Sequence, residues 1–327
     1  YGVLLKLFRK MLTTYIQTGG KNLAFHQINI THFKRNPMSK QHPIIAVTGS
    51  SGAGTSMVST AFEHIFYRKK VTPAIIAGDS FHRYDRKNMK IAVKEAQEKG
   101  HNISHFGPEA NLFDKLEDLF AQYGEHGTGT HREYIHDEEE ASNHKNVNPG
   151  EFTNWQEITP GTDLLFYEGL HGGLVNEDVD IAKHVDLLIG VVPIVNLEWI
   201  QKIHRDTADR GYTPEAVTRT ILRRMEDYVY HITPQFSRTD INFQRVPTVD
   251  TSNPFIARDI PTPDESFIVI RFREPKKYDI DFLYLLNMIH DSFMSRPNTI
   301  VVPAGKMGFA MEVIISPILE NMMLNGD

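Results

Sequence analysis

The sequence has no cysteine among its 327 residues. Disulfide bonds, thiolate metal sites and control through thiol oxidation are therefore excluded. It also lacks an apolar run close to the roughly 20 residues that span a bilayer, and it contains no internal repeat and no low-complexity segment. These absences favour a cytoplasmic protein with no membrane partner.

An excess of positive charge is also absent, since the formal net charge is −6 at pH 7. General binding to nucleic acid needs a basic surface, so we expect no nucleic-acid partner. A small anionic substrate held by a few local cations stays compatible with this charge. With 40% hydrophobic residues, the chain can form one large domain or two small ones.

Residues 1–37 differ in composition from the rest of the chain. They hold six Lys and Arg residues and no acid. One interpretation is an amphipathic membrane or targeting helix over residues 1–16. We prefer the interpretation that this is upstream sequence read into the frame, because a strand begins soon after Met38, the natural start. We therefore expect a single domain over residues 38–327.

From Pro43 onward, strand patterns alternate with helical ones. The expected strands cover residues 43–49, 72–79, 163–169, 185–194, 267–272 and 298–303. Several of these runs are apolar throughout, as in a parallel sheet that is covered on both faces. Between them apolar residues recur at helical spacing, for example over residues 57–66. The pattern predicts an α/β fold with a central, mostly parallel sheet flanked by helices on both faces.

Further helices are expected later in the chain, and two segments fit the alternation poorly. Residues 108–124 have proline near the start and glycine at the end, as helices often do, and residues 278–294 are amphipathic. We expect the last helix to be kinked at Pro317. Residues 124–157 are polar and too long for an ordinary connection, which suggests a functional loop. Residues 231–266 are rich in proline, and we expect a small antiparallel edge there.

The stretch GSSGAGTS has the glycine spacing and final hydroxyl of a phosphate-binding P-loop, but Thr55 stands where that motif has lysine. It follows a strand pattern and opens a helix, so backbone N–H groups can converge on phosphate oxygens. The alternative is a tight strand-to-helix turn without a ligand. The residues expected around the ATP phosphates are Gly49, Ser50, Ser51, Gly52, Ala53, Gly54, Thr55, Ser56 and Met57.

Two further strands end in an acid. Asp79 follows one strand and is surrounded by His82, Arg83 and Arg86, which suit a phosphorylated substrate. Glu168 ends another strand, where nucleotide enzymes hold a metal or its water. The alternatives are a helix-capping aspartate beside a solvated basic face and an acid that merely ends a strand.

The segment KIHRDTADRGYTPE, from Lys202 to Glu215, predicts a cationic helix that contains an acid. Lys202, Arg205 and Asp206 fall within about one turn, and Arg210 follows about one turn later. The glycine after Arg210 ends this helix, and the TPE sequence caps the next one.

This segment resembles the motif of the phosphoribulokinase family, within the wider uridine kinase-like group of P-loop kinases. GSSGAGTS, GDSFHRYDR, FYEGLHGG, NLEWIQKIHRD and DTSNPFIARDIP also look like the bacterial branch, which has threonine after the last P-loop glycine. The resemblance runs from about Met38 to the last helix and implies a P-loop kinase fold.

The resemblance implies ATP-dependent phosphorylation of D-ribulose 5-phosphate at its C1 hydroxyl, giving ribulose 1,5-bisphosphate and ADP in the Calvin cycle. It implies Asp79 as the general base, with Lys202, Arg205 and Asp206 also catalytic. The implied Mg²⁺ ligands are Ser56, Glu168 and Asp206. The implied substrate-binding residues are His82, Arg86, Tyr134, His136, Lys202 and Arg210.

The resemblance also implies a homo-oligomer, an octamer in the bacterial branch, with NADH as activator and AMP as inhibitor. Arginines in places resembling Arg68, Arg271 and Arg296 contribute to the effector site in that branch.

The cation missing at Thr55 must be supplied elsewhere, and we hypothesise that Lys202 and Arg205 supply it. Two alternatives stay open. One is a nucleoside kinase of the same fold, which would need fewer cations after Asp79. The other is a non-catalytic nucleotide sensor that has lost its P-loop lysine.

Overall fold

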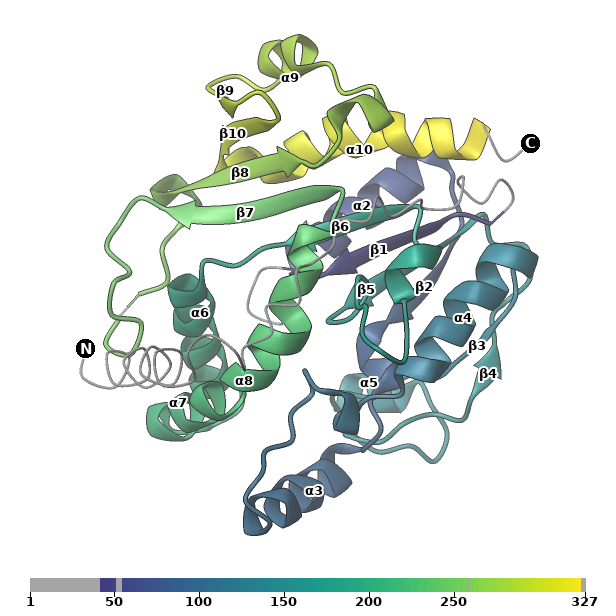
Figure 1. Ribbon diagram of the computed structural model, residues 1–327, viewed down its shortest axis with the longest axis vertical. Helices are drawn as coiled ribbons and strands as arrows, with labels where there is room; N and C mark the ends of the chain where they lie inside the picture. Colours follow the sequence, from purple (N-terminus) through teal and green to yellow (C-terminus); the bar gives the residue numbers. More distant parts are fainter. Residues whose placement is uncertain (1–41, 51–54, 258, 325–327) are drawn as a thin grey trace, which may run out of the picture. The chain divides into compact units, whose positions relative to one another are not determined.

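A mixed sheet of eight strands forms the centre of the part of the chain that the computed structural model describes, namely residues 42–50, 55–257 and 259–324 (Figure 1). All of these residues belong to one compact unit, Pro37–Asp327. The strand order is β2–β5–β1–β6–β7–β8–β10–β9. The bounds are β1 Ile44–Thr48, β2 Pro73–Ala77, β5 Leu164–Gly169, β6 Leu187–Val191, β7 Ile241–Pro247, β8 Ser266–Phe272, β9 Phe293–Arg296 and β10 Thr299–Pro303.

The predicted mostly parallel sheet is confirmed. Strands β2, β5, β1, β6 and β7 run parallel to one another. Strands β8, β10 and β9 extend the sheet by antiparallel pairing. The antiparallel edge expected within residues 231–266 begins with β7, which pairs with β6 on one side and antiparallel with β8 on the other. The edge is larger than expected, because β8 and β10 join it.

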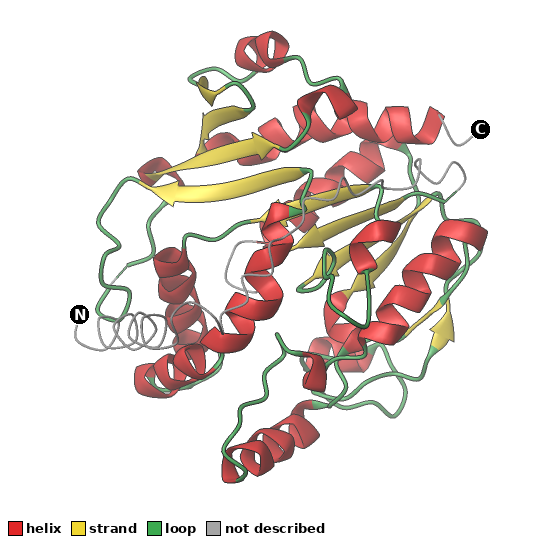
Figure 2. Ribbon diagram, in the orientation of Figure 1, coloured by secondary structure: helices red, strands yellow, loops and turns green. Residues whose placement is uncertain are grey.

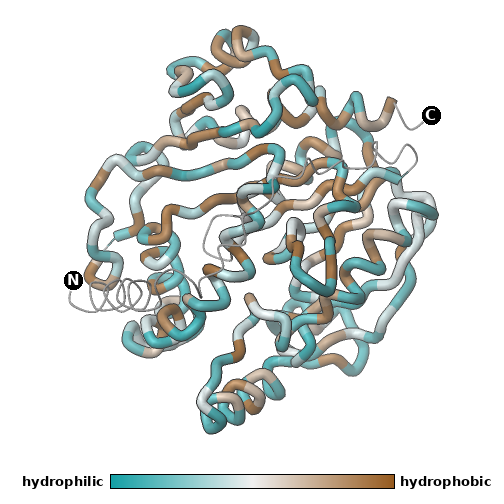
Figure 3. The backbone as a smooth tube through the Cα atoms, viewed as in Figure 1, coloured by the Kyte–Doolittle hydropathy of each residue, from teal (hydrophilic) through white to brown (hydrophobic). Residues whose placement is uncertain are grey.

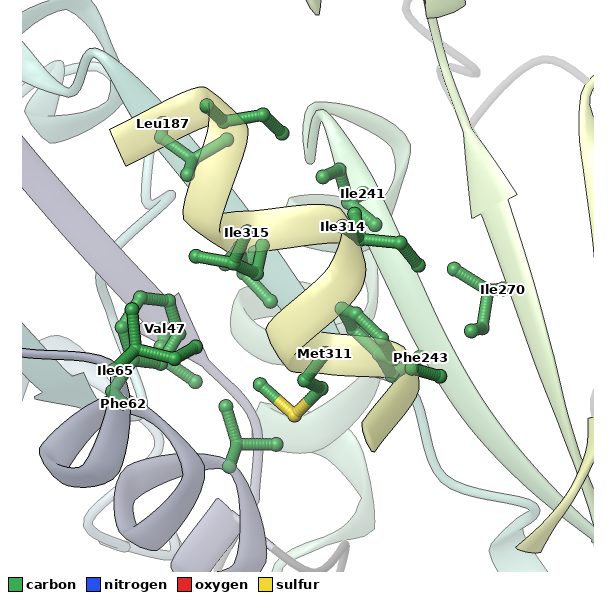
Figure 4. Packing of buried hydrophobic residues seen from close by; sticks show 14 of the residues in the cluster. Val47, Phe62, Ile65, Leu187, Ile241, Phe243, Ile270, Met311, Ile314 and Ile315 are labelled. Carbon is green, nitrogen blue, oxygen red and sulfur yellow. The ribbon is translucent and has the colours of Figure 1, made fainter. Parts of the chain in front are cut away.

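The core lies on both faces of the sheet, as the apolar strands predict. On β1, Ile45 and Val47 join the cluster that contains α2 and α10, while Ile44 and Ala46 join the cluster that contains α4. Figure 4 shows α10 lying across the sheet next to α2. Met311 and Ile315 of α10 therefore belong to one cluster with side chains of α2 and of the sheet. Burying each large apolar side chain contributes about 1.5–3 kcal/mol.

Helices surround the sheet, and the strands in its middle are largely apolar (Figures 2 and 3). The bounds of the helices are α2 Thr55–Lys69, α3 Arg86–Glu98, α4 Phe113–His126, α5 Glu138–Ser142, α6 Val195–Ala208, α7 Pro214–Arg223, α8 Met225–Asp227, α9 Phe282–Met288 and α10 Met307–Leu324. A π-helical turn, Tyr228–Ile232, follows α8 directly.

Two of the predicted helices have different bounds in the structure. The helix expected from residue 108 starts only at Phe113, because Pro108–Ala110 form a separate 3-10 turn. Helix α4 continues through Gly124 and ends at Gly127, whose φ of 66° is left-handed and so favours glycine. The helix expected over residues 278–294 covers only Phe282–Met288, and β9 follows it. Its apolar residues Leu283 and Phe293 are exposed instead of lying on one buried face.

Helix α10 is apolar because it is a core helix. Residues Ala304–Leu324 are long and apolar enough to cross a membrane, and half of that window is buried inside the protein. The sequence analysis did not recognise this segment as such a run. Pro317 lies inside α10, and the helix continues past it to Leu324.

The long polar segment between α4 and β5 contains a small sheet of its own. Thr130–His131 (β3) and Gln156–Glu157 (β4) form an antiparallel pair, with α5 between them. The expectation of a separate segment over residues 1–37 lies outside the described residues.

Candidate active site

The carboxyl ends of three neighbouring parallel strands bring the sequence-predicted acids together. Glu168 on β5 is the register partner of Val47 on β1 and of Ala77 on β2. It therefore lies between the strand that enters the glycine loop and the strand that leads to Asp79. The Gly49 N–H donates to the Gly169 carbonyl at 3.1 Å, which holds the start of the loop at the same edge.

The described part of the glycine loop is anchored by buried polar contacts. Ser50 is 1% exposed, and its hydroxyl donates to Oε1 of Glu198 in the first turn of α6. Thr48 Oγ1 donates to the Leu170 carbonyl and to Gln235 Oε1, both at 3.1 Å. Residues 51–54 and the side chains of residues 55–57 lie outside the described part, so their expected phosphate and Mg²⁺ contacts, including that of Ser56, stay predictions.

Asp79 lies between two imidazoles. His82 Nε2 is 3.5 Å from Oδ1, and His136 Nε2 is 3.7 Å from Oδ2. The Asp79 side chain is 40% exposed, so an acceptor can reach it. Burial, with smaller contributions from neighbouring groups that include His171 and Arg224, lowers the pKa of His82 to about 3, so this ring is neutral at pH 7.

The long polar segment between α4 and β5 supplies His136, and its Tyr134 ring lies near the His82 ring. The Tyr134 ring lies 4.9 Å from the His136 ring and 6.4 Å from the His82 ring. Arg86 Nη2 donates to the His136 carbonyl at 2.6 Å. Tyr134, His136 and Arg86 therefore meet next to Asp79, as the sequence interpretation requires, although no contact with an acceptor is present to test it.

Two arginines near Asp79 donate hydrogen bonds to backbone carbonyls. Arg83, which the sequence offered as a substrate cation, donates to the carbonyls of Glu109 and Asn111. Arg132, which the sequence analysis missed, donates to the carbonyls of Ser80 and His82 at 2.9 and 2.5 Å. Its guanidinium also lies 3.6 Å from the centre of the Phe152 ring. These contacts tie the turn after Asp79 to the polar segment.

Two more histidines lie near His82, the partly exposed His105 and the buried His171. The His105 ring stacks on the His82 ring with centroids 4.1 Å apart. His171 lies 3.0 Å from the Phe106 carbonyl through Nε2 and is fully buried, which lowers its pKa to about 4. Burial also lowers the pKa of His105. The sequence analysis found neither residue, because single histidines in loops have no pattern of their own.

The cationic helix predicted from Lys202 to Arg210 is the second half of α6, which ends at Ala208, so Arg210 lies just beyond the helix. Asp206 on it is buried and contacts three cations: Lys202 Nζ at 2.6 Å, Arg205 Nη2 at 3.0 Å and Arg210 Nη1 at 3.3 Å. Burial alone would raise the pKa of Asp206, but the hydrogen bond from Lys202 and the three positive charges outweigh it and lower the pKa. In this arrangement Asp206 organises cations, and its expected contact with Mg²⁺ stays a prediction.

Arg224, which the sequence analysis also missed, lies between the two groups. Its guanidinium stacks on Phe106 at 4.1 Å, and its charge lowers the pKa values of His82, on the Asp79 side, and of Lys202, on α6. Burial lowers its own pKa to about 10. Within the described residues its buried Nε has no hydrogen-bond partner. Arg224, at the end of α7, therefore adds a positive charge close to Lys202 of α6.

The donor set at the sheet edge fits Mg²⁺, which prefers carboxylate and hydroxyl oxygens with several waters retained. Glu168 is half-buried at the carboxyl end of β5, next to the start of the glycine loop. Among the described residues no group of three or more His, Asp or Glu side chains could hold a metal by itself. A site here would therefore depend on nucleotide oxygens and water as further ligands.

A separate groove of about 520 Å³ lies at the antiparallel end of the sheet. Arg271 on β8 and Arg296 on β9 both line it, and each is a register partner of Thr299 on β10. Arg68, which the sequence grouped with them, contacts Glu312 of α10 and is not among the residues that line the groove.

The sequence profile described as "Phosphoribulokinase / Uridine kinase family" matches residues 44–252. The chain belongs to this family. It is 62% identical over 287 residues to the chromosomal phosphoribulokinase of Cupriavidus necator, covering 88% of this chain and 97% of that protein. The phosphoribulokinase of Xanthobacter flavus is 59% identical over the same length, 88% of this chain and 98% of that protein.

A solved structure, the phosphoribulokinase from Rhodobacter spheroides, resembles the fold with a TM-score of 0.81 and 54% identity. The match covers 88% of this chain and 99% of that one. The P-loop kinase fold expected from the sequence is thereby confirmed, and the family match includes β1 to β7 with the acids, imidazoles and cationic helix described above.

Proposed function

We propose that this family member transfers the γ-phosphoryl group of ATP to the C1 hydroxyl of D-ribulose 5-phosphate, giving ribulose 1,5-bisphosphate and ADP in the Calvin cycle. The observation that carries the proposal is the position of Asp79. A partly exposed carboxylate stands between two imidazoles at the edge of the sheet where Glu168 and the start of the glycine loop also lie. Relatives with 62% and 59% identity are named phosphoribulokinase.

Asp79 is the general base in this proposal. As the C1 hydroxyl attacks phosphorus, its proton passes to a carboxylate oxygen of Asp79, and the bond between the γ-phosphorus and the bridging oxygen breaks to release ADP. His82 is neutral, so it can orient the carboxylate without a charge that would make Asp79 a weaker base. His136 and Tyr134 hold the acceptor from the polar segment.

The sugar phosphate is bound by cations that a neutral nucleoside would not need. In this proposal Arg86 and Arg210 bind the 5-phosphate, and Lys202 and Arg205 act on the transferring group. The exposed guanidinium of Arg210 contacts Asp206 with one nitrogen, which leaves the others for a ligand. This number of cations favours a sugar phosphate over uridine, and the intact set of acids and cations favours an enzyme over a nucleotide sensor.

Mg²⁺ bound with ATP would neutralise charge on the β- and γ-phosphates. Glu168 and Ser56 would hold it or its waters, with Asp206 as a further ligand if its cations turn to the nucleotide. In this structure the cations keep both oxygens of Asp206 occupied.

Regulation by NADH and AMP, assembly as an octamer and a cytoplasmic location belong to the proposal too. Arg271 and Arg296 line the same groove and pair with Thr299 from its two sides, so they lie about 10 Å apart at two strand spacings. Two arginines at this separation suit the paired phosphates of a dinucleotide. Exposed apolar side chains on α9 and β9, including Leu283 and Phe293, suit a contact between copies of the chain.

A coupled assay of ADP formation tests the activity, with D-ribulose 5-phosphate, with uridine and without an acceptor. Rapid ADP formation with the sugar phosphate alone supports the proposal. A preference for uridine would indicate a nucleoside kinase, and no turnover with either would favour the sensor.

A further inference from the structure

The glycine loop and the cationic helix are joined by one buried side chain. Glu198 lies in the first turn of α6, is 7% exposed, and accepts hydrogen bonds through both carboxylate oxygens. Ser50 of the glycine loop donates to Oε1, and the Tyr228 hydroxyl donates to Oε2 at 3.1 Å. Burial raises the pKa of Glu198, and the two hydroxyls and the nearby cations only offset part of that rise.

Glu198 and Lys202 are four residues apart on α6, and so are Lys202 and Asp206. Residues at this spacing lie on one face of a helix, about 6 Å apart along its axis. The three side chains therefore form a row that starts at the glycine loop with Glu198 and continues to the lysine that contacts Asp206. A rotation of α6 by one residue, about 100°, would turn this row away from the loop.

Burying a carboxylate next to a phosphate-binding loop is energetically unfavourable. Its desolvation is unfavourable, and its charge would repel the phosphates of ATP. A neutral side chain could pack there at lower cost. What the carboxylate provides is two acceptor oxygens that fix two separate elements, together with attraction to Lys202 and Arg224 on the same side.

We infer that Glu198 is a positioning residue, whose hydrogen bond from Ser50 holds α6 in the register that places Lys202 one turn from the glycine loop, where the P-loop lysine is missing. The inference rests on the proposed role of Lys202 and goes beyond it, because it says how the replacement charge is held in place. Tyr228 fixes the same carboxylate from the side of the π-helical turn rather than from the start of the loop.

The chain offers a matched pair of variants. Ser50→Ala and Tyr228→Phe each remove one hydroxyl from the same buried carboxylate, so a merely structural role predicts similar losses of melting temperature and activity. We expect a similar fall in melting temperature, but kcat should fall about tenfold in Ser50→Ala and stay within about twofold in Tyr228→Phe, since small misplacements at a reacting group are costly. Equal kcat values in the two variants would overturn the inference.

A double-mutant cycle tests whether Glu198 acts through Lys202. Glu198→Leu keeps most of the volume and removes both acceptors, whereas Glu198→Gln keeps an acceptor and should recover most of kcat. We expect Glu198→Leu to lower kcat about tenfold with little change in the KM for ribulose 5-phosphate. In a Lys202→Met background the same change should have no further effect on kcat.

The outcomes separate the inference from the proposal beneath it. If Lys202→Met lowers kcat and Glu198→Leu lowers it independently by the same factor, the positioning role is wrong and the role of Lys202 stands. If Lys202→Met leaves kcat unchanged, the role of Lys202 fails and the inference fails with it. If the wild-type chain does not phosphorylate ribulose 5-phosphate, the proposed function itself is wrong.

Discussion

Lys202 Nζ lies 2.6 Å from Oδ2 of Asp206, and both residues are largely buried on the inner face of α6. The contact has two consequences. Burial and the charge of Arg224 lower the pKa of Lys202, while the hydrogen bond and the charge of Asp206 oppose that shift. Asp206 also gathers Arg205 and Arg210, so one carboxylate holds three cations beside the glycine loop.

Lys202→Met should lower kcat by a factor that corresponds to a loss of about 3 kcal/mol of transition-state stabilisation. The affinity for ATP should change little, because the charge of Lys202 acts on the transferring group. Steady-state kinetics and a separate ATP-binding measurement check this. Thr55→Lys in the wild-type background should bring no gain. A rise in the KM for ribulose 5-phosphate at constant kcat would make Lys202 a substrate anchor instead.

Asp79→Asn should lower kcat by at least about 10²-fold, since an amide cannot take up the proton of the C1 hydroxyl. The fold and ATP binding should be kept, because Asp79 is partly exposed and the glycine loop is anchored elsewhere. Melting temperature and ATP titration are the controls. Near-normal turnover would remove Asp79 from the role of base.

The buried histidines should make the protein less stable in acid. The pKa of His171 is about 4 in the folded state and near 6.5 when unfolded. The unfolded state therefore binds the proton first, so stability is fully present above pH 6.5 and is lost as pH falls toward 4. At pH 5 the loss is about 2 kcal/mol for this residue.

Denaturant unfolding at pH 7.5 and pH 5 measures this effect. His171→Asn should be less stable than wild type at pH 7.5 and should show a smaller difference between the two pH values. His101→Asn is a matched control, since His101 is exposed, and should leave the difference unchanged. If His171→Asn loses as much stability between pH 7.5 and pH 5 as the wild type does, His171 is not the source of the acid sensitivity.

Arg271→Ala should weaken activation by NADH and leave basal activity in place, because Arg271 lines the groove at the antiparallel end of the sheet rather than the catalytic edge. Activity against NADH concentration, with Arg68→Ala beside it, checks this. Since Arg68 lies outside that groove in one copy of the chain, a loss of activation in both variants would require a site shared between copies. An unchanged curve in Arg271→Ala excludes Arg271.

Sequence reasoning found the parts of the site that follow from local patterns. Asp79 and Glu168 each end an apolar strand, so their meeting at the sheet edge follows from parallel topology. Arg224, Glu198 and His105 could not be found this way. They lie on a helix end, a helix start and a loop, and only tertiary packing makes them buried neighbours of the site.

The limits on the fold prediction have similar causes. Gly124 looked like a helix end, but glycine is tolerated inside α4, and the left-handed residue is Gly127. The strands β8 and β10 carry apolar runs like those of the parallel strands, although β8 buries only alternate residues. Strand direction depends on connections that the pattern of apolar residues does not record.

Analysis of the reaction product by ³¹P NMR tests the central claim most directly. With ATP, Mg²⁺ and D-ribulose 5-phosphate, we predict a second phosphate-ester signal of equal area, coupled to the protons at C1, that grows as ATP is consumed and is absent with Asp79→Asn. A missing second ester, or esterification of uridine in preference to the sugar phosphate, would contradict the account.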